Sequence, residues 1–151
     1  MKKIAFIITT FIRDNLLLKS IESIENNWQN NFETIIVDQG EVTAKKHEWI
    51  NLQSKIHYIP VLFNSGLSYC RNIGVQKAKE LGCEYCFIGS DSFLFNESIK
   101  KINNIVDILE KTNYDLMGFE LMPSVCGWEA KLNLIEGKHF ELDFIDKDKK
   151  L

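Results

Sequence analysis

The amino-acid sequence predicts an α/β fold, a three-layer sandwich in which helices cover both faces of a mostly parallel, Rossmann-like sheet. Short runs of apolar and β-branched residues alternate along the chain with longer segments in which apolar residues recur at helical spacing. Strands that alternate with crossover helices form parallel sheets with helices packed on their faces. The chain has 151 residues, of which 45% are hydrophobic, and this suffices to bury one core.

The first part of the chain contains three predicted strands separated by two helices. Residues 4–9 form a continuous apolar run, which is typical of a strand buried in a parallel sheet. Asp14 can cap the helix that follows, because apolar residues recur three and four positions apart beyond it. The pattern then predicts a strand over residues 32–37, a helix over residues 41–52 and a strand over residues 55–59.

The middle of the chain continues the alternation of helices and strands. A helix is predicted over residues 65–81, and Gly82 follows it as the residue type preferred after a last helical turn. A fourth strand over residues 84–88, a helix over residues 96–110 and a fifth strand over residues 114–121 complete the series.

The end of the chain has a different pattern, which predicts a C-terminal β-hairpin. Residues 132–135 and 139–144 have strand-like composition and flank a Glu-Gly-Lys turn. No linker or repeat interrupts the sequence, so we expect residues 1–145 to form a single domain. Residues 146–151 are expected to form a charged tail.

Composition excludes several classes of protein. The net charge of −3 disfavours an electrostatic nucleic-acid binder, which needs a basic face. No segment approaches the roughly 18–20 apolar residues of a membrane span, and the start of the chain lacks a signal-peptide cleavage site, so we expect a cytoplasmic protein. Cys83 and Cys86 have the spacing of a redox or zinc half-site. They follow a helix and enter a strand, so structural thiols are the favoured interpretation.

Polar side chains and glycines follow the first four predicted strands. Parallel strands bring their carboxyl ends to one edge of the sheet, where α/β proteins bind ligands. The set suits a nucleotide diphosphate, since it combines hydrogen-bonding groups, cations and carboxylates. Taken singly, Asp38 and Asp91 are equally compatible with plain polar strand ends, and Arg71 with a structural ion pair to Asp38 or a helix face. The residues are Thr9, Thr10, Phe11, Arg13, Asp38, Gly66, Arg71, Ser90 and Asp91.

Known nucleotide-binding and hydrolase motifs are absent. No Walker-type phosphate loop and no GxGxxG motif follows the first strand, which disfavours P-loop NTPases and classical dinucleotide enzymes. A nucleophile elbow is missing as well. A nucleotidyltransferase would need a Gly-rich, Lys-bearing loop after the first strand, and this is also lacking.

Four motifs together resemble the nucleotide-sugar-binding half of family 2 glycosyltransferases, which have the GT-A fold. IITTFIR at residues 7–13 is similar to the first strand and "PTYNR" turn of that family, and IIVDQG at residues 35–40 to its "IVVDDGS". NSGLSYCRNIG at residues 64–74 is similar to "NxGxSxARNxG", and FIGSDSFLF at residues 87–95 to "FLDSDDFL". The four occur in the order and spacing of the family over about residues 3–121.

The resemblance implies a role for each matching residue. It places Thr9, Phe11 and Arg13 at the nucleotide base. It also implies that Asp38 binds the base or ribose, that Arg71 lies near the diphosphate, and that Asp91 holds Mn²⁺ or Mg²⁺ between the phosphates. The residues that receive a role in this way are Thr9, Phe11, Arg13, Asp38, Arg71 and Asp91.

The sequence departs from the family pattern at several motif positions. Thr9 stands where the family usually has Pro, and Ile12 where it has Asn. Gly89 replaces the first Asp of the DxD motif and Ser92 an acidic neighbour, so this is a short form with a degenerate DxD. Asp91 is then the only aspartate of the motif left to hold a metal ion. Phosphate oxygens would have to complete the coordination of that ion.

Sugar transfer with inversion also needs a general base, which the resembled family carries in its acceptor half. Glu129 is the candidate here, beside Trp128, which could stack on a sugar ring; Glu120 and Asp143 are weaker candidates. The favoured alternative is that Trp128 packs in the core and Glu129 is solvated.

Two hypotheses about function follow from the motifs. In the first, the chain is the donor-binding domain of a glycosyltransferase that transfers a sugar from a nucleotide-diphosphate sugar. The resemblance favours a UDP sugar as donor, with acceptor elements supplied by a further segment or a partner chain. In the second hypothesis, the chain is a non-catalytic nucleotide-sugar-binding or interaction module derived from this fold.

Overall fold

The computed structural model divides the chain into two compact units, Met1–Asn113 and Tyr114–Leu151. The single domain expected over residues 1–145 and the charged tail over 146–151 stay predictions. The structure describes residues 2–27, 32–51, 56–95, 102–112, 128–135 and 139–146.

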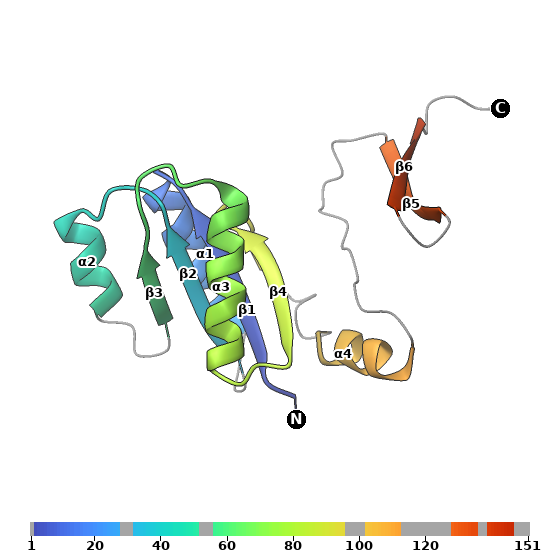
Figure 1. The fold of residues 1–151 in the computed structure, drawn as a ribbon. Coiled ribbons are helices and arrows are strands. Elements are labelled where there is room, and N and C mark those ends of the chain that lie inside the picture. Colours follow the sequence, from blue (N-terminus) through green and yellow to red (C-terminus); the bar gives the residue numbers. More distant parts are fainter. Residues whose placement is uncertain are drawn as a thin grey trace. The chain divides into compact units, whose positions relative to one another are not determined.

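The first unit is built on a parallel sheet of four strands in the order β3-β2-β1-β4 (Figure 1). The pairing places Thr10 opposite Asp38 and Thr9 opposite Ser90, so the carboxyl ends of these strands are level. The predicted fold class, α/β with a mostly parallel sheet, is therefore confirmed. The strands are β1 (Ile4–Thr10), β2 (Phe32–Asp38), β3 (Ile56–Pro60) and β4 (Tyr85–Ser90).

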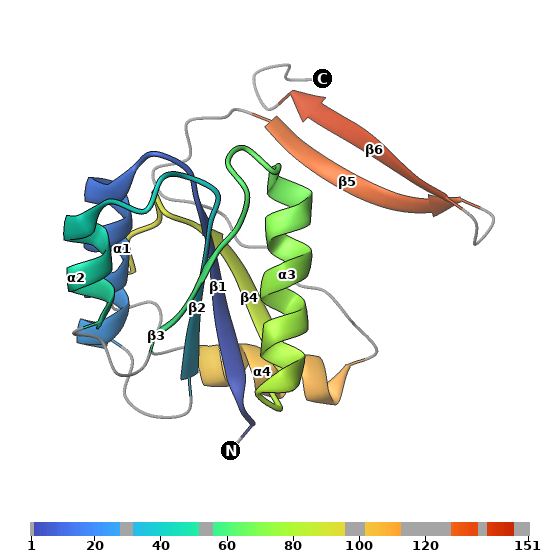
Figure 2. The same ribbon diagram turned by 60° about the vertical axis from the view of Figure 1, so that its left-hand side comes forward.

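Helices cover both faces of this sheet and form the outer layers of the sandwich (Figure 2). One core cluster joins alternate residues of β1 to Leu17, Ile21 and Ile24 of α1, with Trp49 of α2 and Val106 of α4 packed on the same cluster. The other cluster joins the opposite face of β1 to α3. The helices are α1 (Asp14–Asn27), α2 (Ala44–Asn51), α3 (Leu67–Glu80) and α4 (Ile102–Lys111).

Local sequence explains where two of these helices begin. α1 begins with Asp14 itself, whereas the sequence predicts Asp14 as the cap before the helix. The Arg13 carbonyl accepts the Leu17 amide hydrogen at 3.0 Å, so Arg13 has the cap position. α2 begins at Ala44, three residues later than the sequence pattern predicts, because Thr43 Oγ1 accepts the Lys46 amide hydrogen at 3.2 Å and so caps the helix. None of the described helices is both long and apolar enough to span a membrane.

Two glycines fix how α3 packs and ends. Gly82 has a φ of 73°, a left-handed conformation that favours glycine, and it follows the helix as predicted. Gly74 lies on the face of α3 that packs on β1. A Cβ atom there would lie 2.4 Å from Cγ2 of Ile7, so the absence of a side chain sets the distance between helix and sheet.

The second unit contains the strands β5 (Trp128–Ile135) and β6 (His139–Asp146), which pair antiparallel. Ile135 lies opposite His139, and residues 136–138 between them lie outside the described residues. The predicted fifth strand over residues 114–121 and the first residues of the helix predicted over 96–110 also lie outside them.

Substitution Gly74→Ala tests the close packing of α3 on β1. We expect a loss of about 1–2 kcal/mol of unfolding free energy, because the new methyl group collides with buried Ile7 and the gain in helix propensity offsets only part of that cost. Urea denaturation measures the difference, with Gln76→Ala, an exposed position on α3, as the control. The same substitution in an Ile7→Ala background should cost much less; an equal cost in both backgrounds would contradict the packing argument.

Candidate functional site

The structure brings the predicted polar residues to one edge of the parallel sheet. Thr9 and Thr10 end β1, Asp38 ends β2, and Ser90 ends β4 with Asp91 directly after it. The connection between β1 and α1 contains Phe11 and Arg13. Gly66 directly precedes α3, and Arg71 lies in that helix with its side chain exposed.

Asp91 forms the most tightly connected part of this edge. Its side chain is fully buried, and Thr10 Oγ1 donates to its Oδ2 at 2.8 Å. Arg13 Nη2 lies 2.7 Å from Oδ1, and Ser90 Oγ donates to the same oxygen at 3.2 Å. The Arg13 side chain remains 50% exposed. Three predicted site residues are thus in direct contact with a fourth.

The residues around Asp91 do not fit a divalent cation as they stand. Both carboxylate oxygens already have partners, and one partner is a positively charged guanidinium. Gly89 offers no ligating side chain where the family motif has an aspartate. Among the described residues, no group of three or more His, Cys, Asp and Glu side chains could hold a metal ion. The expected Mn²⁺ or Mg²⁺ at Asp91 stays a prediction.

Asp38 is also fully buried, and its partners come from three directions. The Gly40 amide donates to Oδ1 at 2.7 Å, which folds the chain back directly after β2. Lys46 Nζ and the Tyr58 hydroxyl donate to Oδ2 at 2.7 and 2.8 Å. The carboxylate that the sequence places at the base or ribose therefore fixes the loop after β2 and ties it to α2 and β3.

Lys46 is the central residue of this network, although none of the sequence motifs includes it. Its ammonium lies 2.7 Å from both Asp14 Oδ1 and Asp38 Oδ2 and donates to the Glu41 carbonyl at 3.1 Å, with the side chain only 3% exposed. Burial alone would lower the pKa of Lys46, but the hydrogen bonds to Asp14 and Asp38 outweigh it and raise the pKa above its ordinary value. One signal was available: Lys46 precedes Trp49 by three positions, so both lie on one helix face.

Tyr58 is fixed as a hydrogen-bond donor by the same network. Its burial, together with the hydrogen bond to Asp38 and the charge of that carboxylate, raises the pKa of Tyr58 far above its ordinary value. The hydroxyl therefore keeps its proton and donates it to Oδ2.

Gln39 joins three connections at the edge and was likewise not singled out by sequence. Its amide donates to the Thr10 carbonyl at 3.2 Å, its carbonyl accepts from the Asn64 amide at 3.0 Å, and its Oε1 accepts from the Gly66 amide at 2.8 Å. Ile12 and Asn64, one in each of two neighbouring loops, have φ values of 58° and 54°. Non-glycine residues in this left-handed region are strained, and such strain concentrates at functional sites.

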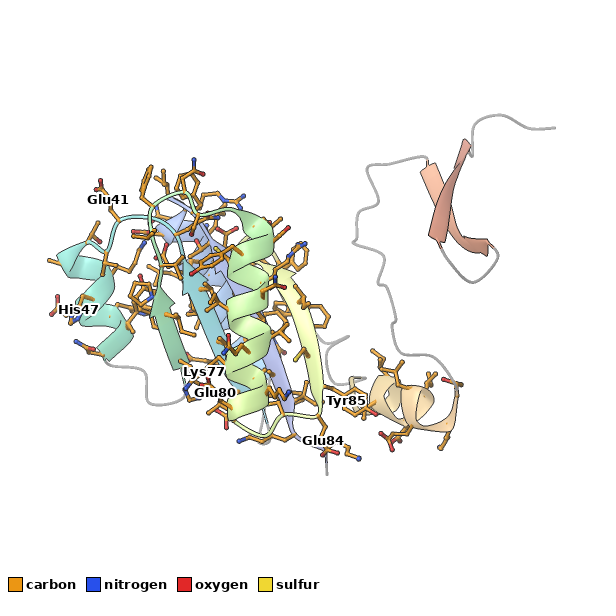
Figure 3. All side chains as sticks on the ribbon, viewed as in Figure 1. Glu41, His47, Lys77, Glu80, Glu84 and Tyr85 are labelled. Atoms are coloured by element: carbon orange, nitrogen blue, oxygen red, sulfur yellow. The ribbon has the colours of Figure 1, made fainter. Side chains whose placement is uncertain are left out.

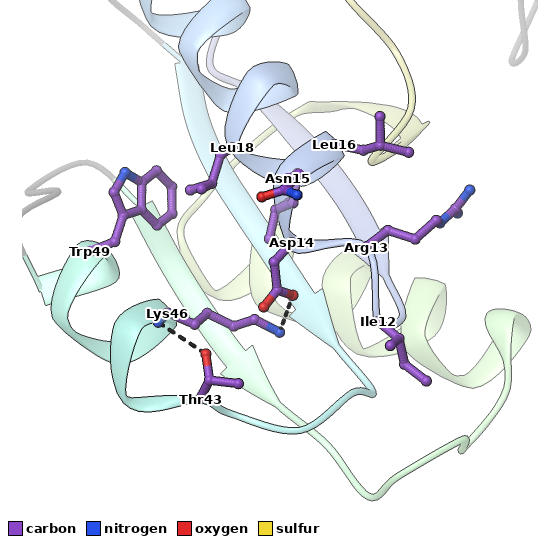
Figure 4. Close-up of a pocket in the computed structure, with 10 residues that line it drawn as sticks. Ile12, Arg13, Asp14, Asn15, Leu16, Leu18, Thr43, Lys46 and Trp49 are labelled. Atoms are coloured by element: carbon purple, nitrogen blue, oxygen red, sulfur yellow. Dashed lines mark hydrogen bonds and ion pairs between the residues drawn. The ribbon is translucent and has the colours of Figure 1, made fainter.

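A pocket of about 460 Å³ lies beside this edge, between α1 and α2 (Figure 4). Asp14 and Lys46, which form an ion pair, are among its polar lining residues, and Lys46 also contacts Asp38. Leu18 and Trp49 form much of its apolar wall. Arg13 also lines the pocket, so this residue borders both the pocket and the Asp91 cluster.

Comparison with known proteins shows the family. Residues 5–131 match the family described as Glycosyl transferase family 2. The chain belongs to this family. The match covers all the described residues of the site edge and ends within β5.

Relatives of this family 2 chain are much longer than the chain itself. An uncharacterized glycosyltransferase of Rickettsia bellii (strain RML369-C) is 28% identical over 114 residues, which cover 74% of this chain and 16% of that protein. The crystal structure of S. aureus TarS has a TM-score of 0.59 at 18% identity and covers 72% of this chain and 20% of TarS. A structure of TarS 1–349 in complex with UDP has a TM-score of 0.58 at 18% identity, covering 70% of this chain and 32% of that one.

One predicted residue of the family 2 chain belongs to a different unit from the others. Glu129 belongs to β5 in the second unit, whereas the other nine predicted residues belong to the first unit. Its role as general base stays a prediction.

Substitution Lys46→Met tests whether the buried ammonium stabilises this family 2 fold. We expect a loss of about 3–5 kcal/mol of unfolding free energy, because Asp38 keeps its buried charge but loses its cation. Lys77→Met is the matched control. Lys77 pairs with Glu80 at the end of α3 away from the site (Figure 3), so its change should stay within about 0.5 kcal/mol.

The pH dependence gives a second test of the same contact. Because the pKa of Lys46 is raised on folding, its contribution is complete below the unfolded value of 10.5 and is lost as pH rises through the folded value. The wild-type chain should therefore lose stability more steeply than the Lys46→Met variant above pH 10.5. If the wild type and Lys46→Met lost unfolding free energy equally steeply above pH 10.5, the role assigned to Lys46 would be contradicted. Equal urea midpoints for Lys46→Met and Lys77→Met would contradict it as well.

Proposed function

We propose that the chain is the donor-binding domain of a glycosyltransferase, and that it binds the diphosphate of a UDP sugar at the carboxyl edge of its parallel sheet. One observation carries the proposal: the half-exposed Arg13 is held on the buried Asp91 at this edge. A cation fixed at the mouth of a parallel sheet is suited to an anionic ligand. The structure of the fold neighbour TarS 1–349 in complex with UDP supports the choice of nucleotide.

The chemistry of sugar transfer explains why cations belong at this edge. Negative charge grows on the leaving diphosphate as its bond to the sugar breaks, and fixed positive groups stabilise that charge. Arg13 and Arg71 are the two arginines of the chain; Arg13 directly precedes α1, and Arg71 lies near the start of α3. The exposed Arg71 is the second candidate for contact with the phosphates, while Thr9 and Phe11 stay candidates for the base and Gly66 for close approach of the backbone.

The buried network has a supporting role in this proposal. Asp38 is engaged by Gly40, Lys46 and Tyr58, so we assign it to holding the loop that borders the nucleotide. Asp38 is fully buried, so a direct contact with the base or ribose, as the family resemblance implies, would require the residues around it to move.

Complete transfer needs groups beyond those of the first unit. An acceptor hydroxyl must lose its proton, and Glu129 is the proposed base. Relatives that extend far beyond the matched region suggest that further segments or a partner chain contribute the acceptor site. Membership of the family favours a transferase over a non-catalytic module.

Titration with UDP tests the proposal through Arg71. We expect saturable binding by the wild-type chain and about tenfold or greater weakening in Arg71→Gln, because a charge-assisted hydrogen bond to phosphate is lost. Isothermal calorimetry measures both affinities, and Lys77→Gln, remote from the edge, should bind as the wild type does. Failure of UDP, GDP and their sugar conjugates to bind the wild-type chain would reject the proposed function. Separate assays of nucleotide-sugar hydrolysis and transfer then distinguish an enzyme from a binding module.

A further inference from the structure

The ion pair between Arg13 and Asp91 suggests how the diphosphate charge is balanced. Asp91 is fully buried and receives Thr10 on Oδ2 and Arg13 on Oδ1. Oδ1 is shared by Arg13 and Ser90, and a divalent cation bound to the remaining lone pair of Oδ2 would be repelled by the guanidinium on the same carboxylate. The positive charge next to Asp91 is already supplied by the chain itself.

Arg13 can serve as a bridge between a carboxylate and a phosphate. A guanidinium carries five N–H donors in a planar fork, and it retains its charge at any accessible pH. One nitrogen, Nη2, contacts Asp91 at 2.7 Å, while half of the side chain remains exposed. The remaining donors are therefore available to an anion that approaches from solvent. This is the same bridging task that a divalent ion performs between a carboxylate and phosphates.

The backbone around Arg13 fixes this arrangement before a ligand binds. Its carbonyl accepts the amide hydrogens of Leu16 and Leu17, each at 3.0 Å, so it is tied to the first turn of α1. Ile12 before it has a φ of 58°, a turn that directs the chain from β1 into the helix. Lys46, another cation at this end of the sheet, is 3% exposed and already bound by Asp14 and Asp38.

We propose that Arg13 takes the place of a divalent cation: it bridges Asp91 and the diphosphate, and nucleotide binding by this chain is independent of metal. The inference rests on the proposed function, since it requires a nucleotide diphosphate at this edge. It assigns Arg13 to the phosphates, whereas the family resemblance alone would place this residue at the base. Gly89, where the motif has an aspartate, is consistent with a site that does not retain a metal.

The first test compares UDP binding in EDTA and in Mn²⁺ by calorimetry. The wild-type affinity should differ by less than about threefold between the two conditions. In EDTA, Arg13→Gln should weaken binding ~10- to 100-fold, because a charge-assisted contact to phosphate is removed. The affinity of Arg13→Lys should lie between those of the wild type and Arg13→Gln, since lysine keeps the charge but lacks the planar fork of donors. Lys77→Gln is the control, and thermal melting verifies that each variant is folded.

A double variant separates a direct contact from simple neutralisation of Asp91. In Arg13→Gln with Asp91→Asn, no unpaired charge is left in the buried position. If Arg13 acts by bridging to the phosphate, binding in EDTA stays weak in this variant. Recovery of wild-type affinity in it would overturn the inference, because Arg13 would then serve only to balance Asp91.

Two further outcomes would overturn the inference, and they are distinguishable from failure of the proposed function. Tightening of wild-type binding by Mn²⁺ of about threefold or more would show that a metal contributes to binding. Unchanged binding of Arg13→Gln in EDTA would show that Arg13 does not contact the phosphates. In both cases UDP still binds, so the proposed function survives. Absence of UDP binding in EDTA and in Mn²⁺ alike would reject both.

Discussion

Strand β1 is buried along all seven of its residues, and the rest of the first unit is arranged around it. Its side chains alternate between the two core clusters, and its backbone pairs with β2 on one edge and β4 on the other. A strand constrained on both faces and both edges has one possible register, because a slip of one residue would exchange its two faces. The carboxyl end of β1 therefore has a fixed position, and Thr10 and Arg13 with it.

Two buried carboxylates at this end of the sheet are each paired with a cation. Asp38 is balanced by Lys46, which is almost completely buried, whereas Asp91 is balanced by Arg13, which is half exposed. The two ion pairs therefore have different effects. The buried pair of Lys46 with Asp38 stabilises loops around the site, whereas the pair of Arg13 with Asp91 keeps a cation available to solvent. The difference lies in which partner remains accessible, and it separates a structural role from a binding role.

The sequence predicted the fold well because the relevant signals are local. Apolar runs predicted residues 4–9 and 32–37 as strands, and the structure has β1 and β2 within one residue of these bounds. Parallel strands also bring their carboxyl ends together, so the location of the site followed from the fold class. The pairing of Arg13 with Asp91 and the burial of Lys46 did not follow. Both depend on partners distant in sequence, and a lysine in a short polar helix looks solvated unless its two carboxylate partners are known.

The central position of β1 also has a consequence for amide hydrogen exchange. Its amides and carbonyls are shared with two neighbouring strands, so their exposure to solvent requires β2 or β4 to detach. Such amides exchange only through large-scale unfolding, in contrast to those of terminal helical turns. A ligand held by residues at the end of β1 would therefore slow exchange throughout the sheet by the same factor. Exchange rates far from the edge would then report occupancy at the edge.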